Sequence, residues 1–546
     1  MLILILLTFL AYINIYNNEF LSDDIDGIVK NPIIKDIAYN LRSGNIFNII
    51  LSIDYAIGGL NPPIYHLTSV IFHTLNVILV YVLVNLLPES LFTKFPSKKS
   101  LALFTALIFA VHAVHTEAVT WISGRGYVFY SFFVLISLVS FIYLFNRPKL
   151  PRKIKIILFC LSLISFFFAL QTSERAAILP GLLVAYLLLF NKIKILTERR
   201  TFYFLIPYFI MPLFFLSSFL TRLAVRTEKI APLFDAESTI RNPFIQIPIA
   251  LATYIKLLFT PLNLTLYHQF VISQIEFIQD VIITLLFFAP AVIFFRKSKI
   301  IVFALTFFLI AISLNLLPVK IAWLAAERYI YLGSVGFSLF LSYAIYKLGE
   351  LFKSPPLPVV LLSIFVGVNI LLTLNRNLEW QNQDTLWPAT VRVSPLIPMA
   401  HNNMGDYYMR HGNLKDAIKE FSLAIDLNDG KYPEAIHNLG NAYLTKNDAT
   451  AAAKLFEKAI LQKPDQIESY LQLASIAISQ KDYPQAEKSL SEALKINPNY
   501  SPIYNSLGVI AFLKGDKIKA KELLERALAL DPDNTLAKNN LSRLQP

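Results

Sequence analysis

Residues 435–465, AIHNLGNAYLTKNDATAAAKLFEKAILQKPD, are one copy of a pattern that decides the fold of the C-terminal part. Related copies occupy residues 400–428, 469–499 and 503–533, with a period of about 34 residues. Small residues stand at three fixed columns of the four copies, which lets two antiparallel helices approach closely in each copy. The columns are Gly405, Gly440, Ala474 and Gly508; Ala417, Ala452, Ala486 and Ala520; and Ala424, Ala459, Ala493 and Ala527.

Proline then ends the second helix of a copy at Pro464, Pro498 and Pro532. Four helix pairs in register resemble tetratricopeptide repeats, and the tail TLAKNNLSRLQ (535–545) resembles a capping helix that covers the last stacking face. We predict an α-solenoid over residues 397–546, made of four repeats and this cap. Such repeats form a concave groove for polypeptides, so we expect an acceptor or partner protein there. The alternative for any polar residue of the repeats is a solvated helix face.

The first 396 residues have the composition of a membrane protein. The whole chain of 546 residues is 55% hydrophobic and only 16% charged, whereas a soluble chain has about 25% charged residues. Apolar runs of about 17–25 residues span a bilayer, and we predict an all-α polytopic domain over residues 1–396 with about eleven spans. The predicted spans are 2–17, 64–87, 101–116, 127–145, 154–171, 175–190, 203–220, 279–295, 300–317, 330–347 and 357–374.

The net charge of +12 indicates topology rather than nucleic-acid binding. Residues 397–546 contain 18 Lys and Arg against 18 Asp and Glu, so the excess lies in the short loops between the apolar runs. Basic clusters in alternate loops predict a cytoplasmic N-terminus and extracytoplasmic repeats. The pattern holds if the apolar stretch 244–260, interrupted by Pro248 and Lys256, is re-entrant or interfacial.

Two further features concern the compartment. The single cysteine, Cys160, excludes an intramolecular disulfide. The N-terminus lacks a basic region and a small-residue cleavage site, which predicts a retained first helix rather than a signal peptide. The frequent Ile, Lys and Asn suggest a bacterium, and we expect the protein in its inner membrane.

Adjacent acids follow the first span in FLSDDIDGIVKNP (20–32). Asp23 or Asp24, at the membrane surface, could accept a proton from a hydroxyl nucleophile. The alternative is an acidic surface turn, since Asp26 follows.

Other polar residues gather at the predicted outer ends of spans. His66 and His73 share a helix face with Asn76, which favours either a polar cavity lining or an interhelical hydrogen-bond pair. The remaining candidates are His112, His115, Glu117 and Arg125 in one short stretch, and the two Glu-Arg pairs Glu174–Arg175 and Glu327–Arg328. The histidine spacing matches no zinc signature. Arginine has a forked donor suited to phosphate, and the alternative is snorkelling to lipid headgroups.

The ordered set of motifs resembles the transmembrane and tetratricopeptide repeat-containing O-mannosyltransferases, which have the C-type glycosyltransferase fold. The motifs are FLSDDIDGIVKNP, NPPIYHLTSVIFHTLN, FAVHAVHTEAVTWISGR, SERAAILP and AERYIYLGSVGF, followed by the repeats.

The resemblance implies that the donor is a sugar on a polyprenyl phosphate, and that Asp23 or Asp24 is the base. Arg175 or Arg328 would stabilise the leaving phosphate, and an inverting transfer would place the sugar on a protein Ser or Thr. The other donor-site candidates in these motifs are His66, His112, His115, Glu117, Arg125, Glu174, Glu327 and Tyr331. No cofactor is expected, because the lipid-linked sugar is a co-substrate; the need for a divalent metal stays open, as do the sugar and the acceptor.

The competing interpretation is a non-catalytic membrane anchor that presents the repeats to partner proteins. An enzyme needs Asp23 or Asp24, Arg175 and Arg328 around one outward cavity that opens to lipid, whereas an anchor lets them point apart. A transporter would carry charges in the middle of its spans, and here the charges gather at the ends.

Overall fold

The structure is a computed structural model that describes residues 1–91, 97–190, 199–230, 242–270, 273–317 and 324–544. Over these ranges the chain forms helices and no strands. It divides into two compact units, Met1–Val393 (unit 1) and Ser394–Pro546 (unit 2). The all-α fold class predicted from the sequence is confirmed.

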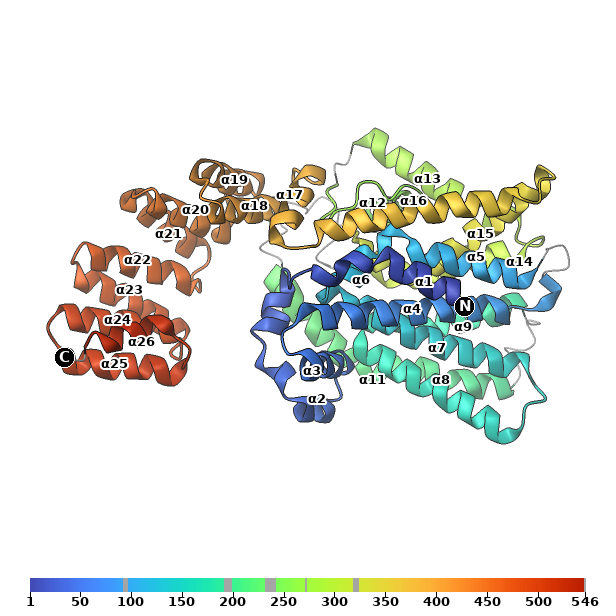
Figure 1. Cartoon of the computed structure of the whole chain (residues 1–546), viewed down its shortest axis with the longest axis horizontal. Coiled ribbons are helices and arrows are strands. Elements are labelled where there is room, and N and C mark those ends of the chain that lie inside the picture. Colours follow the sequence, from blue (N-terminus) through green and yellow to red (C-terminus); the bar gives the residue numbers. More distant parts are fainter. Residues whose placement is uncertain (92–96, 191–198, 231–241, 271–272, 318–323, 545–546) are drawn as a thin grey trace. The chain divides into compact units, whose positions relative to one another are not determined.

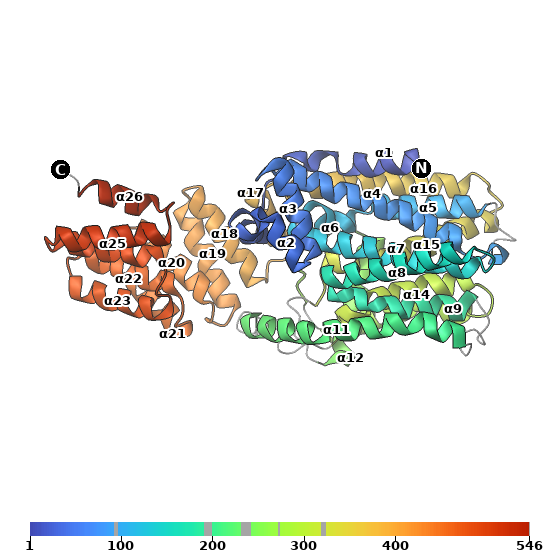
Figure 2. The same cartoon turned by 90° about the horizontal axis from the view of Figure 1, so that it is seen from below.

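Unit 1 is a bundle in which the long helices α4, α5, α7 and α8 lie side by side (Figures 1 and 2). Two short helices, α2 and α3, gather at one end of the bundle in both views. The helices of unit 1 are α1 (Leu2–Ala11), α2 (Ile37–Ser43), α3 (Ile46–Gly58), α4 (Pro62–Leu86), α5 (Lys98–Val111), α6 (Thr116–Thr120), α7 (Gly126–Asn146), α8 (Arg152–Thr172), α9 (Leu179–Phe190), α11 (Arg199–Ile230), α12 (Pro243–Phe259), α13 (Gln274–Ile293), α14 (Lys299–Ile312), α15 (Ser334–Leu351), α16 (Leu357–Glu379) and α17 (Gln383–Val393).

Length and composition support seven or eight of the eleven predicted spans. Among the described residues, 7 helices are long and apolar enough to cross a membrane, or up to 8 if α5 and the segment Ala113–Thr120 form one broken span. The other three predicted spans are helical but fall short. The first ends as an α-helix at Ala11, the helix α9 has 12 residues, and α15 carries Lys347 and Glu350 near its end.

The stretch 244–260 forms the 17-residue helix α12 with Pro248 inside it. Its length is below that of the candidate spans, and its re-entrant or interfacial placement stays a prediction. Residues 221–243, between two of the predicted spans, fall partly outside the described residues, since α11 continues to Ile230 and residues 231–241 are not described.

The bend between α5 and α6 positions the candidate site. Helix α5 ends at Val111, His112 is extended, and the two axes meet at 51°. A short 3-10 helix, η5 (Ala113–His115), leads into α6, and a second, η6 (Ser123–Arg125), leads into α7. The sequence predicted one span ending at residue 116, so the chain changes direction earlier than expected.

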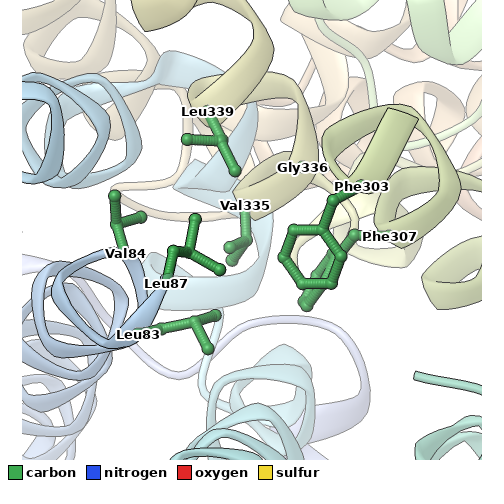
Figure 3. A pocket seen from close by; sticks show the side chains of 8 residues that line it. All are labelled: Leu83, Val84, Leu87, Phe303, Phe307, Val335, Gly336 and Leu339. Atoms are coloured by element: carbon green, nitrogen blue, oxygen red, sulfur yellow. The ribbon is translucent and has the colours of Figure 1, made fainter. Parts of the chain in front are cut away.

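An apolar cavity lies elsewhere in unit 1, between α4, α14 and α15 (Figure 3). Its lining contains no polar side chain and none of the predicted site residues. The lining residues are Leu83, Val84, Leu87, Phe303, Phe307, Val335, Gly336 and Leu339.

Unit 2 consists of consecutive helix pairs (Figure 1). The first small-residue column is explained by the partner helix: a Cβ on Gly440 would lie 2.7 Å from the Phe456 ring, and Gly405 faces Phe421 in the same way. The helices are α18 (Pro398–Arg410), α19 (Leu414–Leu427), α20 (Pro433–Thr445), α21 (Ala449–Gln462), α22 (Ile467–Ser479), α23 (Tyr483–Ile496), α24 (Ser501–Leu513), α25 (Lys517–Leu530) and α26 (Thr535–Ser542).

Candidate active site

The segment from α6 to η6, residues 116–125, contains two of the predicted polar residues of unit 1 and binds two more, Asp24 and Arg328. Glu117, Ser123 and Arg125 each bind a different distant part of the chain. Gly124 allows the tight turn, because a Cβ there would lie 2.6 Å from the Glu117 carbonyl oxygen. Thr120 adds a hydrogen bond of 2.9 Å to Asn377 near the end of α16.

Asp24 is fixed to this segment. Its Oδ1 accepts hydrogen bonds from the Ser123 backbone N–H, at 2.7 Å, and from the Ser123 hydroxyl, while Oδ2 accepts from the Leu21 N–H at 3.0 Å. The residue is 1% exposed. Burial raises the pKa of Asp24 to about 6, although the hydrogen bonds from Ser123 and Leu21 and the charge of Arg125 act to lower it.

Asp23 is exposed, as is Asp26, which forms an ion pair of 2.9 Å with Lys30. The two adjacent acids therefore have different environments, one buried against η6 and one facing outward. Ser22, just before them, has a positive φ of 51°, which turns the chain sharply at this point.

Arg125 is committed to a buried ion pair. Its Nη2 lies 2.6 Å from Asp54 Oδ2, its Nη1 donates to the Tyr65 carbonyl at 3.1 Å, and both charged side chains are nearly inaccessible. Asp54 also accepts a hydrogen bond of 2.6 Å from Thr68. This pair joins α3 to the start of α7, and the structure brings neither group to the surface.

Glu117 and Arg328 form a second buried pair. One Glu117 oxygen accepts from the Arg328 N–H at 2.8 Å, and the other contacts Arg328 Nη1. The Arg328 guanidinium is 5.4 Å from the centroid of the Trp121 ring and 5.0 Å from that of Tyr329. Burial acts to lower the pKa of Arg328, but the Glu117 carboxylate and nearby tyrosines raise it overall, so this side chain stays cationic.

The Arg175 side chain also lies over the ring of Tyr329. Its guanidinium is 5.0 Å from the Tyr329 centroid and 5.1 Å from that of Tyr127. Its Nε donates to Asn315 at 2.8 Å, and Glu174 lies 3.4 Å from Nη1. Because Arg175 and Arg328 are equally far from one ring centroid, at most twice that distance separates the two cations.

The predicted histidines occupy the interior of the bundle. His73 lies 2.6 Å from the hydroxyl of Tyr331 and 3.0 Å from the Ala110 carbonyl, and His115 lies 2.7 Å from the Ser334 hydroxyl. None of these contacts involves Arg175 or Arg328. The two remaining rings, His66 and His112, contact the carbonyl oxygens of Asn18 and Leu258.

Each of these carbonyl contacts requires a ring nitrogen that donates, since a carbonyl oxygen only accepts. Asn76 completes the group by donating to the Tyr331 hydroxyl at 3.1 Å. These bonds pair at least one nitrogen of each buried ring with a polar group of the bundle.

Glu327 begins a further chain of buried charges. It accepts from the Thr265 N–H, lies 3.5 Å from Arg376 Nη2, and lies 3.8 Å from His268 Nε2. Burial raises the pKa of Glu327 above its usual range, against the lowering effect of Arg376. Arg376 in turn contacts Glu379 at 2.5 Å.

Some of these residues were not singled out from the sequence. Arg376 and Glu379 are three residues apart in NRNLEWQ, which is the spacing of an ion pair on one helix face. The sequence could therefore have predicted this pair. Asp54, Ser123 and Tyr329 offered none, because their partners are distant in sequence. No group of three or more His, Cys, Asp or Glu suited to a metal ion occurs within the described ranges.

Comparisons with known proteins agree with both units. Residues 444–508 and 501–534 match models of the tetratricopeptide repeat. The chain is 27% identical to protein O-mannosyl-transferase F38B6.6 of Caenorhabditis elegans, over 78% of this chain and 62% of that protein. It is 25% identical to protein O-mannosyl-transferase TMTC3 of Mus musculus, over 78% of this chain and 50% of that protein. The chain thus spans about half to three-fifths of the length of these relatives.

Among solved structures, a crystal structure of MamA is 22% identical with a TM-score of 0.25, and covers 27% of this chain and 86% of that chain. A crystal structure of YrrB, described as a tetratricopeptide repeat protein with an unusual peptide-binding site, is 18% identical with a TM-score of 0.24. It covers 36% of this chain and 97% of that chain.

Proposed function

We propose that this chain, a homologue of proteins named protein O-mannosyl-transferase that carries tetratricopeptide repeats, is an integral-membrane glycosyltransferase. It moves a sugar from a polyprenyl phosphate to a hydroxyl of a polypeptide on the extracytoplasmic side. The observation that carries this proposal is that Asp24 and Arg328 both bind residues 116–125, while Arg175 lies beside Arg328. Asp24 binds Ser123, Arg328 binds Glu117, and Arg175 shares the Tyr329 ring with Arg328.

The two arginines suit the leaving group. When the bond from the anomeric carbon to the phosphate oxygen breaks, its electron pair goes to the polyprenyl phosphate, which gains a negative charge. Cations already in place stabilise that developing charge without rearrangement. Arg175 and Arg328 are held by Asn315 and Glu117 in such a preorganised state.

The other half of the reaction requires a base. The acceptor hydroxyl gives its proton to a carboxylate as its oxygen forms the new bond to the anomeric carbon, opposite the leaving phosphate. Asp24 is the better candidate, because its pKa of about 6 makes it a stronger base than an exposed aspartate while it stays ionised at neutral pH. Among the described residues, Oδ2 accepts a hydrogen bond from the Leu21 N–H and keeps a lone pair for that proton.

The repeats of unit 2 are the candidate site for the acceptor polypeptide, since stacked helix pairs present a concave surface. A membrane anchor without catalytic activity would need the same repeats. Such an anchor would not need two arginines over the Tyr329 ring, each paired with a glutamate.

The test is a transfer assay with the full chain in membranes, a radiolabelled polyprenyl-phosphate mannose, and protein-bound label as the readout. Asp24→Asn is expected to lower transfer by about a hundredfold or more, the usual contribution of a general base. Asp23→Asn is expected to keep activity within a few fold.

Asp26→Asn is the matched control, because this exposed acid lies in the same loop and pairs only with Lys30 in the described structure. Label that persists in Asp24→Asn, at normal expression, would move the base elsewhere. Loss of label in Asp23→Asn alone would assign the base to the exposed acid instead.

A further inference from the structure

Among the buried polar atoms of unit 1 that have no hydrogen-bond partner within the described residues, five belong to side chains that form one cluster. Each belongs to a residue that is at most 9% exposed. The atoms are Trp121 Nε1, Trp380 Nε1, Arg376 Nε, His268 Nε2 and Glu327 Oε2.

The contacts between these side chains are continuous. The rings of Trp121 and Trp380 are stacked, with centroids 5.8 Å apart and an angle of 26° between their planes. The Arg376 guanidinium lies 5.6 Å from the Trp380 centroid, and its Nη2 lies 3.5 Å from Glu327. His268 lies 3.8 Å from the same carboxyl group.

The cluster lies between the two parts of the proposed reaction. On one side, Trp121 is covered by the guanidinium of Arg328. On the other, Trp121 is two residues before Ser123, which binds Asp24. The stretch that precedes Asp24 also binds the residue after the second tryptophan, since the Glu19 N–H donates to the carbonyl of Gln381 at 2.8 Å.

The chemistry of the five atoms fits a ligand that both donates and accepts. Two indoles and Arg376 Nε can only donate, the Glu327 carboxyl accepts and also donates when protonated, and His268 does either according to its tautomer. Buried polar groups are normally paired, because an unpaired one costs more than a hydrogen bond contributes. One ordered water makes about two to four hydrogen bonds, whereas this cluster presents five polar atoms that are unpaired among the described residues.

We infer that Trp121, Trp380, Arg376, Glu327 and His268 form the binding pocket for the sugar of the lipid-linked donor. Each sugar hydroxyl is a donor and an acceptor at once, which matches the mixed donors and acceptors of the cluster. This inference rests on the proposed function, because it needs the donor phosphate at Arg175 and Arg328 to bring the sugar to the tryptophans.

The test compares two probes on the full-length protein in detergent: citronellyl phosphate, and citronellyl phosphate carrying one hexose. Mannose, glucose, galactose and N-acetylglucosamine are each tried as the hexose. The measured quantity is the ratio of the two dissociation constants. At least one hexose is expected to tighten binding by about tenfold, the effect of a few hydrogen bonds after their losses.

Trp380→Phe keeps a ring and removes only the indole N–H. We expect this variant to bind citronellyl phosphate as the wild type does, and to lower the hexose-dependent ratio by about fivefold, the effect of one hydrogen bond. His268→Gln is a second variant that keeps a polar group of similar reach. Trp387→Phe is the matched control, because Trp387 is also buried but stacks on Tyr267, outside the cluster.

The outcomes separate the two proposals. If citronellyl phosphate binds and no hexose changes its affinity, or if Trp380→Phe and Trp387→Phe behave alike, the sugar pocket is wrong while the phosphate site stands. If neither probe binds wild type that elutes as a single species, the proposed function fails with it. An unchanged affinity of the variants for citronellyl phosphate shows that they are folded.

Discussion

Asp24 combines a fixed position with a raised basicity, and both follow from burial against η6. An exposed aspartate titrates near pH 4, whereas Asp24 titrates at about 6. If Asp24 is the base, transfer requires its ionised form. We therefore expect the rate of sugar transfer to fall about tenfold per pH unit below pH 6, and to reach a plateau above it. The measurement is kcat/KM for transfer between pH 4.5 and 8.

Ser123 gives a sharper form of the same prediction. Its side-chain hydrogen bond stabilises the Asp24 carboxylate and lowers the pKa, so Ser123→Ala is expected to move the acid limb to higher pH. The main effect of Ser123→Ala should be on the pH at the midpoint of the acid limb, and the plateau value of kcat/KM should change little. An acid limb near pH 4 in both proteins would show that the titrating group is exposed, and would exclude Asp24 as the base.

At the scale of single elements, the sequence predicted the helices better than the breaks between them. The run 101–116 is a continuous apolar stretch, yet the helix ends at Val111 and bends at His112. At this bend His112 Nε2 bonds to the carbonyl of Leu258, 146 residues away. A local pattern cannot contain such a partner, which is also why Trp121 and Ser123 could not be recognised as site residues.

The docking of α3 depends on one ion pair. Arg125→Leu would leave Asp54 buried without its cation, and breaking a buried pair in this way costs about 3–5 kcal/mol. We expect a marked fall in thermal stability of the detergent-solubilised protein. Arg328→Lys serves as the contrast, because it keeps a positive charge beside Glu117 and should lower transfer far more than it lowers the melting temperature.

The first repeat contains a pH-sensitive contact. His401 Nδ1 lies 2.5 Å from Glu420, and its Nε2 lies 2.8 Å from the carbonyl of Pro395. Burial acts to lower the pKa of His401, but the bonds to Glu420 and Pro395 raise it above 6.5 overall. A raised folded pKa stabilises the protonated form, so the contribution is fully present below the unfolded pKa and is lost as the pH rises through the folded value.

We therefore expect α18 and α19 to unfold at a lower urea concentration at pH 8.5 than at pH 5.5. Pulse proteolysis of the full chain, followed through a C-terminal tag, measures this midpoint. Glu420→Gln should remove most of the difference. Equal midpoints at the two pH values in the wild type would contradict the role given to His401.

At the scale of the whole chain, the sequence predicted an apolar helical part followed by repeats, and both are observed. Four aligned copies gave a strong signal, because each copy repeats the same packing of a small residue against a neighbouring helix. The number of membrane crossings is harder to predict from the sequence, since α1, α9 and α15 are short or carry charges. Which side each loop faces stays a prediction.

The single cysteine makes that prediction testable. In a Cys160→Ser background, one cysteine is introduced at Asp26, Lys153 or Lys481, all exposed positions. The predicted orientation requires Asp26→Cys and Lys481→Cys to react with a membrane-impermeant maleimide in intact cells, and Lys153→Cys to react only after permeabilisation. Labelling of Lys153→Cys alone in intact cells would show that the orientation is the opposite of the predicted one.

The two arginines on the Tyr329 ring also bear on turnover. Arg328 is paired with Glu117 and Arg175 with Glu174, so the four side chains carry no formal net charge. A phosphodiester donor brings one negative charge to them, and the departing phosphomonoester carries close to two. Under the proposed function the two cations stabilise this growing charge, and without the two glutamates they would hold the more charged product more tightly. If the proposed function holds, the glutamates that accompany the arginines favour release of the spent lipid carrier, and their removal is expected to make the product a stronger inhibitor.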